Sequence, residues 1–320
     1  MTGLATGRAP LELVVPASLA GERLDRAVVA LLSDRSRAEI SRWISEGAVL
    51  VDGRVVRPSA TVRGGERLVV TPPPPLPSAA KPDPSVVFRV VHADAAVIVV
   101  DKPAGLVVHP SKGHWEGTLV HGLLALGDLA DADPDGEDAA LRPGIVHRID
   151  RGTSGLLVVA RTAVAREALK AQFSAHTIER VYDALAVGPL ADRLDLDTAY
   201  GRHPRDRLKF TGKSGEKRAR THVVVVERLA CGVARIECRL ETGRTHQIRV
   251  HLSEAGAPLL GDPLYGRPPA DPRARAAADA LARQALHARV LGFDHPTTGK
   301  RVRFEAPWPE DFAAAVRALR

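Results

Sequence analysis

One aspartate near the middle of the chain carries the strongest chemical signal. Asp150 lies between Arg148 and Arg151, and small turn residues and the apolar run Gly155–Ala160 follow it. Such a run predicts a buried strand, so we expect the carboxylate at the end of a rigid element. A nearby arginine favours the charged form of a carboxyl group. A permanently ionised aspartate suits a nucleophile, although a structural salt bridge at the start of a strand would use the same residues.

A second polar segment spans residues 241–252, with the sequence Glu-Thr-Gly-Arg-Thr-His-Gln-Ile-Arg-Val-His-Leu. Its last six residues alternate between polar and apolar side chains. The alternation predicts a strand that lines a cleft, with Gln247, Arg249 and His251 together on one face. An ordinary exposed strand would show the same pattern.

Two shorter segments also hold candidate functional residues. The strand-like run Val97–Val100 is followed by Lys102-Pro103, and this pair is also common in ordinary turns. Tyr182, one of three tyrosines in the chain, begins another strand-like run that extends to Val187. A buried core tyrosine is the alternative to a functional one at this position.

Taken in order along the chain, these four segments resemble the motifs of the pseudouridine synthases that modify ribosomal large-subunit RNA and some tRNAs. The resemblance implies that Asp150 is the catalytic nucleophile, that Arg249 is its basic partner, and that Tyr182 is the active-site tyrosine. Ile149 and Gly152 depart mildly from the usual leucine and polar residue, and neither change touches the chemistry.

The resemblance also implies a set of substrate contacts from the same motifs. These residues are Lys102, His147, Arg148, Arg244 and Gln247. A target base must leave the stacked helix before it can react. We expect Arg148 to hold the flipped nucleotide or to occupy the vacated space, while the Tyr182 ring stacks on the uracil and its hydroxyl relays a proton.

A proline-rich stretch divides the chain. Such runs form stiff, extended tethers, so residues 72–84 are predicted to link a small module, residues 11–71, to a larger domain, residues 85–320. In the small module, a helical pattern opens at Arg23-Leu24-Asp25. A capping box at Ser36–Glu39 starts a second helix, which Gly47 ends, and a small sheet with a turn at Asp52-Gly53 follows.

This small module resembles the alpha-L RNA-binding module first known from a small-ribosomal-subunit protein. Its helices carry Arg35, Arg37 and Arg42, which would face RNA phosphates. The alternative is that these arginines are solvated surface charges.

The larger domain is predicted to be α+β, with a mixed, largely antiparallel sheet of the pseudouridine synthase type. Strand-like runs dominate it without regular alternation with helices, which argues against a doubly wound nucleotide-binding fold. Helices are expected at about Thr118–Leu126, Ala163–Ser174, Ala270–Gln284 and Pro309–Leu319. An arginine-rich loop is expected between Gly201 and His222, and its RNA-backbone contacts would include Arg202, Arg205, Arg207 and Lys209.

Composition narrows the class of protein. The net charge is +7 and the sequence pI is about 9.8, as expected for a protein with a polyanionic partner. Two cysteines, Cys231 and Cys238, exclude a disulfide framework and are expected in strands as buried thiols. Asp131–Gly136 resembles the start of a calcium loop, but Arg142 stands where glutamate is required. We therefore expect no metal site.

The sequence thus predicts an enzyme that isomerises uridine to pseudouridine in 23S rRNA. The reaction changes no redox state, so no cofactor is expected. No apolar run reaches the roughly 18 residues of a membrane span, and we expect a cytoplasmic monomer. The alternatives are a synthase that acts on tRNA and a non-catalytic RNA-binding protein.

Overall fold

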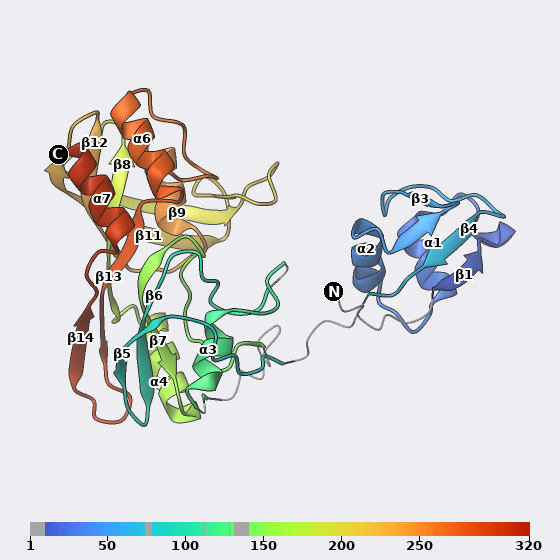
Figure 1. Ribbon diagram of the computed structural model, residues 1–320, viewed down its shortest axis with the longest axis horizontal. Helices are drawn as coiled ribbons and strands as arrows, with labels where there is room; N and C mark the ends of the chain where they lie inside the picture. Colours follow the sequence, from blue (N-terminus) through green and yellow to red (C-terminus); the bar gives the residue numbers. More distant parts are fainter. Residues whose placement is uncertain (1–9, 74–78, 112, 128, 131–140) are drawn as a thin grey trace. The chain divides into compact units, whose positions relative to one another are not determined.

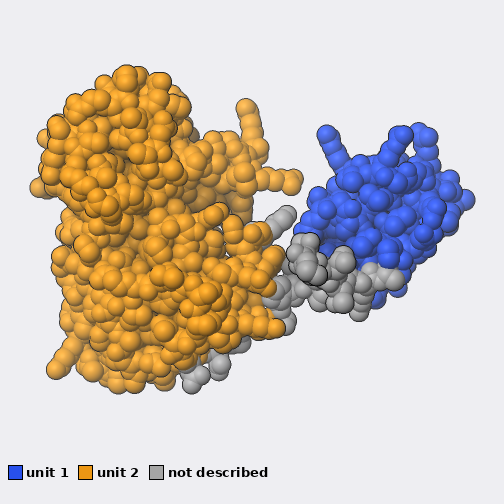
Figure 2. Space-filling model, in the orientation of Figure 1, with its two compact units in different colours: residues 1–76 blue, residues 77–320 orange. Residues whose placement is uncertain are grey.

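The computed structural model describes residues 10–73, 79–111, 113–127, 129–130 and 141–320. The chain separates into two compact units, Met1–Leu76 and Pro77–Arg320, coloured separately in Figure 2. Most of the proline run and the acidic segment Asp131–Gly136 lie outside the described residues.

The smaller unit packs two helices against a four-stranded sheet (Figure 1). Its elements are β1 (Leu11–Val14), α1 (Leu24–Leu31), α2 (Arg37–Ser45), β2 (Val49–Val51), β3 (Arg54–Val55) and β4 (Arg67–Val70), with a short 3-10 turn at Ala17–Leu19. The strand order is β1-β4-β2-β3, and all pairs are antiparallel. Ser36 caps α2 by accepting a hydrogen bond from the Glu39 amide at 3.2 Å, as the capping box predicts.

The larger unit is built on one ten-stranded sheet in the order β10-β9-β11-β12-β8-β13-β7-β6-β5, with β14 added beside β13. The elements are β5 (Arg89–Ala93), β6 (Val97–Lys102), α3 (Leu119–Ala125), β7 (Ser154–Ala160), α4 (Ala163–Ser174), β8 (Glu179–Val187), β9 (Arg193–Arg202), β10 (Phe210–Thr211), β11 (Lys217–Arg228), β12 (Val233–Leu240), α5 (Gln247–Glu254), α6 (Pro272–Leu281), β13 (Leu286–Asp294), β14 (Arg301–Glu305) and α7 (Glu310–Leu319). Among the described strands, only the β7–β13 pair is parallel. This mixed, largely antiparallel α+β fold confirms the predicted fold class.

Helices cover the sheet where its strands are apolar on both faces. In Figure 1, α6 and α7 lie together over the part that holds β8 and β12, and α4 lies beside β7. Leu185 of β8 packs with Phe312 of α7, and Leu169 of α4 packs with Val158 of β7. Every residue of β7 is buried. Because β7 leads directly from Asp150, this packing fixes the position of the carboxylate.

The prediction of a strand at Gln247–Leu252 is wrong, because these residues form helix α5. Ile248 and Leu252, four residues apart, join the same hydrophobic cluster, as neighbouring turns of a helix do. All six residues are buried, and each polar one has hydrogen-bond partners within the protein: Gln247 and His251 at the start of β11 and on Thr221, Arg249 on Asp262. A short alternating pattern could not distinguish a strand from a helix. Here the polar side chains are buried and hydrogen-bonded within the protein, and they do not form one solvent-exposed face.

Two smaller expectations also fail. The segment between Gly201 and His222 is not one loop, because β10 interrupts it and β11 begins at Lys217. Cys231 lies in a turn with φ +64° and is half-buried, whereas Cys238 is a buried free thiol in β12, as expected.

Gly155 permits the parallel contact between β7 and β13. Its φ is +111°, and a Cβ atom there would lie 2.3 Å from the Ala288 carbonyl oxygen. We expect Gly155→Ala to lower the free energy of unfolding by roughly 3 kcal/mol or more, from backbone strain and overpacking together. Gly299 has φ +67° and open space around its Cβ position, so Gly299→Ala should cost only about 1 kcal/mol. Urea titrations of both variants would test this, and equal losses would contradict the packing argument.

Candidate active site

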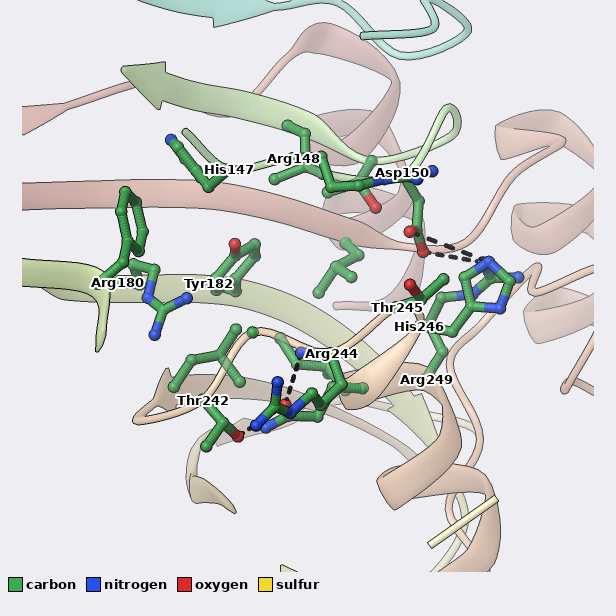
Figure 3. A pocket seen from close by; sticks show the side chains of 18 of the residues that line it. His147, Arg148, Asp150, Arg180, Tyr182, Thr242, Arg244, Thr245, His246 and Arg249 are labelled. Atoms are coloured by element: carbon green, nitrogen blue, oxygen red, sulfur yellow. Dashed lines mark hydrogen bonds and ion pairs between the residues drawn. The ribbon is translucent and has the colours of Figure 1, made fainter. Parts of the chain in front are cut away.

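The site is centred on an ion pair between Asp150 and Arg249. Asp150 Oδ2 lies 2.9 Å from Arg249 Nη1 (Figure 3). The Asp150 side chain is 16% exposed, whereas that of Arg249 is only 6% exposed. The carboxylate therefore opens onto a cavity while the arginine supports it from behind. Among the described residues, Arg249 makes the ion pair, and the expected contacts from Arg148 and Arg151 to this carboxylate are absent.

Asp262 holds Arg249 in place from the other side. Its two carboxylate oxygens accept hydrogen bonds from Arg249 Nε and Nη2, both at 2.8 Å. Asp262 also accepts from the backbone amides of Leu264 and Tyr265, which fixes the carboxylate itself. Although burial opposes both charges, these contacts hold the pKa of Asp262 below, and that of Arg249 above, their ordinary values. The guanidinium is thus a fixed fork with one arm directed at Asp150.

His246 lies beside Arg249 and faces the other oxygen of the Asp150 carboxylate (Figure 3). Its Nε2 is 4.0 Å from Asp150 Oδ1, and its Nδ1 is 2.9 Å from the Tyr265 hydroxyl. That hydroxyl also accepts a hydrogen bond from the Phe210 amide. Burial lowers the pKa of His246, and the charge of Asp150 opposes that shift.

The cavity in front of Asp150 measures about 510 Å³, within the range of small-ligand sites. In Figure 3, Tyr182 lies between Arg180 and the Asp150–Arg249 pair. Tyr182 and Arg180 are two residues apart on β8 and so share one face of the strand. Arg180 Nη2 donates to the Glu241 carbonyl at 2.7 Å, while its Nε is buried without a hydrogen-bond partner among the described residues.

The charged side chains that line the cavity are positive, except for the candidate nucleophile Asp150. Asp150 is the one acidic residue among its described lining residues, and four arginines line it with Asp150: Arg148, Arg180, Arg244 and Arg249. Arg148 is exposed. A cavity with this lining favours an anionic ligand, such as a nucleotide.

His147 lines the cavity but also serves the fold. Its Nε2 accepts the Val158 amide at 3.0 Å, and its ring packs on Phe173. Burial and the charge of Arg180 lower the pKa of His147 to about 3. His147 is therefore a neutral imidazole with its proton on Nδ1.

Gln247 and Arg244 shape the loop that precedes α5. Gln247 Oε1 accepts from the Thr242 hydroxyl and the Arg244 amide, and its Nε2 donates to the Arg220 carbonyl and the Thr221 hydroxyl. These four contacts use both ends of the amide. Gln247 thus positions the loop, while Arg244, which donates Nε to the Arg218 carbonyl at 3.1 Å, lines the cavity.

Lys102 does not reach this cavity. Its side chain is 0% exposed, and Nζ donates to the carbonyl oxygens of Pro103, Leu106 and Arg151, at 2.8, 2.8 and 3.2 Å. Burial lowers the pKa of Lys102 to about 7, and the charge of Asp150 opposes that shift. The lysine therefore holds the loop after β6 against the segment that carries Asp150, instead of contacting substrate.

The arginines expected to bind RNA are partly engaged within the protein. In the smaller unit, Arg37 pairs with the buried Asp25 at 2.8 Å, and Arg35 lies over the Trp43 ring at 5.7 Å. Arg42 is half-buried in α2. RNA contact by these three remains a prediction.

In the larger unit, the expected RNA contacts lie between β9 and β10. Arg202, Arg205 and Arg207 are exposed. Arg202 lies over the Phe210 ring at 4.9 Å, and Lys209 Nζ is 4.0 Å from Asp206 Oδ2. RNA contact by these four residues also remains a prediction.

Sequence reasoning missed Arg180, His246, Asp262 and Tyr265. A signal existed for Arg180, since it lies two residues before Tyr182 in a strand-like run. His246 stood inside a segment that was already singled out, but its left-handed backbone, with φ +61°, was hidden. Nothing in the sequence linked Asp262 and Tyr265 to Arg249, because that link is tertiary. Among the described residues, no group of three His, Cys, Asp or Glu side chains could hold a metal ion, and no helix could span a membrane.

Comparisons with known proteins place this chain among RNA-modifying enzymes. The profile of the RNA pseudouridylate synthase family matches residues 96–254, and that of the S4 domain matches residues 22–68. A ribosomal large subunit pseudouridine synthase D from Neisseria meningitidis is 46% identical over 312 residues, covering 96% of this chain and 81% of the relative. A protein of the same name from Xanthomonas campestris is 44% identical over 316 residues, covering 97% of this chain and 92% of the relative.

A solved structure agrees with these sequence matches. Human RNA pseudouridylate synthase domain containing 1 superposes with a TM-score of 0.55 at 26% identity, covering 73% of this chain and 90% of the human one. The chain belongs to the RNA pseudouridylate synthase family and carries an N-terminal S4 domain. It is an RNA pseudouridine synthase, an isomerase.

The geometry predicts that Asp262 affects the rate of turnover indirectly, by positioning Arg249. Asp262→Asn would weaken the fork that aims Arg249 at Asp150, so we expect pseudouridine formation to fall at least about tenfold, from roughly 1.4 kcal/mol or more of lost transition-state stabilisation. RNA affinity should change little. A buried pair of this kind also contributes to stability, and its disruption costs roughly 3–5 kcal/mol.

Asp183→Asn is the matched control for this variant. Asp183 is a buried carboxylate paired with Arg289 at 3.1 Å and lies outside the cavity. Both variants should unfold more easily, but only Asp262→Asn should turn over slowly at temperatures where both are folded. Equal turnover in the two would contradict the positioning role.

Proposed function

We propose that this enzyme converts uridine to pseudouridine in 23S rRNA, with Asp150 as the nucleophile. The observation that carries the proposal is the partly exposed Asp150 carboxyl group, held by a buried arginine at the opening of a cationic cavity. The choice of rRNA draws on the relatives named as large subunit pseudouridine synthases.

The proposed reaction breaks the bond between uracil N1 and ribose C1′ and forms a bond between C5 and C1′. The C5 proton is lost and N1 gains a proton, so the product is an isomer and needs no added reagent. Asp150 would attack the sugar or the base, and either route requires its anionic form. The Arg249 guanidinium directs positive potential at that carboxylate. Arg249 would orient Oδ2, and His246 lies 4.0 Å from Oδ1, the oxygen that would face the substrate.

Arg180 and Tyr182 would recognise the flipped uracil. Arg180 lines the cavity beside Tyr182, and its guanidinium carries only hydrogen-bond donors. A uracil carbonyl oxygen is an acceptor of the right kind. Burial raises the pKa of Tyr182, opposed by the charge of Arg180, so the phenol stays protonated. Tyr182 can therefore take part in proton transfer only by donating its own phenolic proton.

Asp150→Asn should abolish pseudouridine formation and leave RNA binding within about threefold of the wild type, because the amide keeps the shape but is not a nucleophile. Unmodified 23S rRNA and, separately, tRNA would be incubated with each protein, and pseudouridines would be mapped at single-nucleotide resolution. Asp195→Asn, on the exposed strand β9, is the control. Turnover by Asp150→Asn would refute the nucleophile. Modification of tRNA alone would refute the rRNA substrate, and modification of neither would refute the proposed function.

Tyr182→Phe separates the two proposed roles of the tyrosine. The phenylalanine ring keeps the stacking surface but cannot relay a proton, so kcat should fall at least about tenfold while KM stays within about twofold. Tyr182→Ala should raise KM as well, because base stacking is worth about 1–3 kcal/mol. Steady-state kinetics on the mapped RNA would decide, and an unchanged kcat for Tyr182→Phe would remove the hydroxyl from the mechanism.

A further inference from the structure

A second cavity meets the first one at Asp150. It measures about 680 Å³ and shares with the first cavity the residues Arg148, Ile149, Asp150, His246 and Arg249. The rest of its lining is different. It comes from the loop after β6, from Arg151 and Gly152 beside Asp150, and from Pro263 and residues 281–284 at the end of α6. The proposed nucleophile therefore lies where two cavities join, and only the first is needed to hold a single flipped base.

Hydrogen bonds within the protein hold the walls of the second cavity before any ligand binds. One wall is the loop Ala104–Val108, which Lys102 ties down through the carbonyls of Pro103 and Leu106. Gly105 and Arg151 then hold each other, because the Gly105 amide donates to the Arg151 carbonyl at 2.8 Å and Arg151 Nε donates to the Gly105 carbonyl at 3.1 Å. The buried lysine thus fixes the shape of this cavity.

The charges around the second cavity favour an anion. Asp150 is the one acidic residue among its described lining residues, and it is already paired with Arg249. Arg148 and Arg151 are both exposed at its edge. Arg283, which also lines it, is occupied by Asp311 and by three backbone carbonyls. Arg148 lines both cavities, so Arg151 is the exposed arginine that belongs to the second cavity alone.

The remaining lining suits a sugar and a base. It is apolar at Ala104, Val107, Pro263, Leu281 and Ala282. His114 adds an aromatic ring, and its Nε2 lies 3.5 Å from Arg151 Nη1. Apolar and aromatic surface beside a cation is the usual composition of a site for single-stranded nucleic acid.

We propose that the second cavity binds the nucleotide adjacent to the target uridine in the same RNA strand, with Arg151 on its phosphate. This inference rests on the proposed function. A uridine whose C1′ lies at Asp150 continues through its phosphodiester into the neighbouring nucleotide, and the second cavity opens at that same residue. Holding that nucleotide would keep the strand from restacking and would make recognition depend on the base next to the target.

A double-mutant cycle between protein and RNA tests this proposal. Short RNAs containing the mapped uridine would carry a neutral methylphosphonate at either adjoining phosphate or an abasic site at either neighbouring position. Kd and KM would be measured for the wild type, Arg151→Gln and Arg193→Gln. Arg193 is an exposed arginine on β9 outside both cavities, so this control removes the same charge from the same unit.

We expect Arg151→Gln to weaken binding roughly tenfold or more, as for a lost charge-assisted hydrogen bond. A methylphosphonate at one of the two adjoining phosphates should weaken wild-type binding by a similar factor. The same substitution should add little to the loss of affinity in Arg151→Gln. Arg151→Lys should recover part of the affinity. Arg193→Gln should remain fully sensitive to the neutral linkage. Additive losses at both flanking positions, or equal losses for the two glutamine variants, would overturn the proposal.

A binding assay distinguishes a failure of this proposal from a failure of the proposed function. Single-stranded oligouridine serves as a probe that needs no turnover. If the wild type forms no pseudouridine but Arg151→Gln still binds oligouridine at least tenfold more weakly than Arg193→Gln, the proposed function fails and the nucleotide site stands. Equal Kd values for the two variants overturn the site even if turnover is normal. Thermal unfolding of each variant confirms that it is folded at the assay temperature.

Discussion

The shared guanidinium of Arg249 is the interaction on which the rest of the site depends. Asp262 holds it through two hydrogen bonds and Asp150 through one. A buried charge of this kind is tolerated only when it is fully paired, so helix α5, the Asp262 turn and the Asp150 segment must meet in one arrangement. The sheet provides that arrangement, because β7 leads away from Asp150 and the loop after β12 leads into α5.

A second line of contacts connects the same carboxylate to the arginine-rich segment between β9 and β10. The Phe210 amide donates to the Tyr265 hydroxyl, which is hydrogen-bonded to His246 Nδ1, and His246 Nε2 faces Asp150. Arg202 in turn lies over the Phe210 ring. The base of a surface segment suited to RNA phosphates is therefore packed directly onto the support of the proposed nucleophile. RNA contact at that segment would bear on the same hydrogen bonds that fix His246.

Several polar residues near the cavity act mainly on its shape. Lys102 and Gln247 are buried and use their donors and acceptors within the protein, and His147 accepts a backbone amide of β7. Such fully satisfied polar groups fix loops more precisely than apolar packing alone. A motif in this family therefore contains residues that contact the substrate and residues that hold the contacting residues in place. The sequence alone does not show which residue has which role.

The fold class, the helices α3, α4, α6 and α7, the cap at Ser36 and the family could all be predicted from the sequence. These features depend on local patterns: apolar periodicity, capping residues and the order of motifs. Packing between distant segments accounts for the remaining features. It turned the alternating segment Gln247–Leu252 into a helix, because burial on every side removes the contrast between faces that periodicity detects. The family resemblance implied Arg249 as the partner of Asp150, but local patterns pointed only to the neighbours Arg148 and Arg151. The ion pair joins residues 99 positions apart, and the packing of the sheet brings them together.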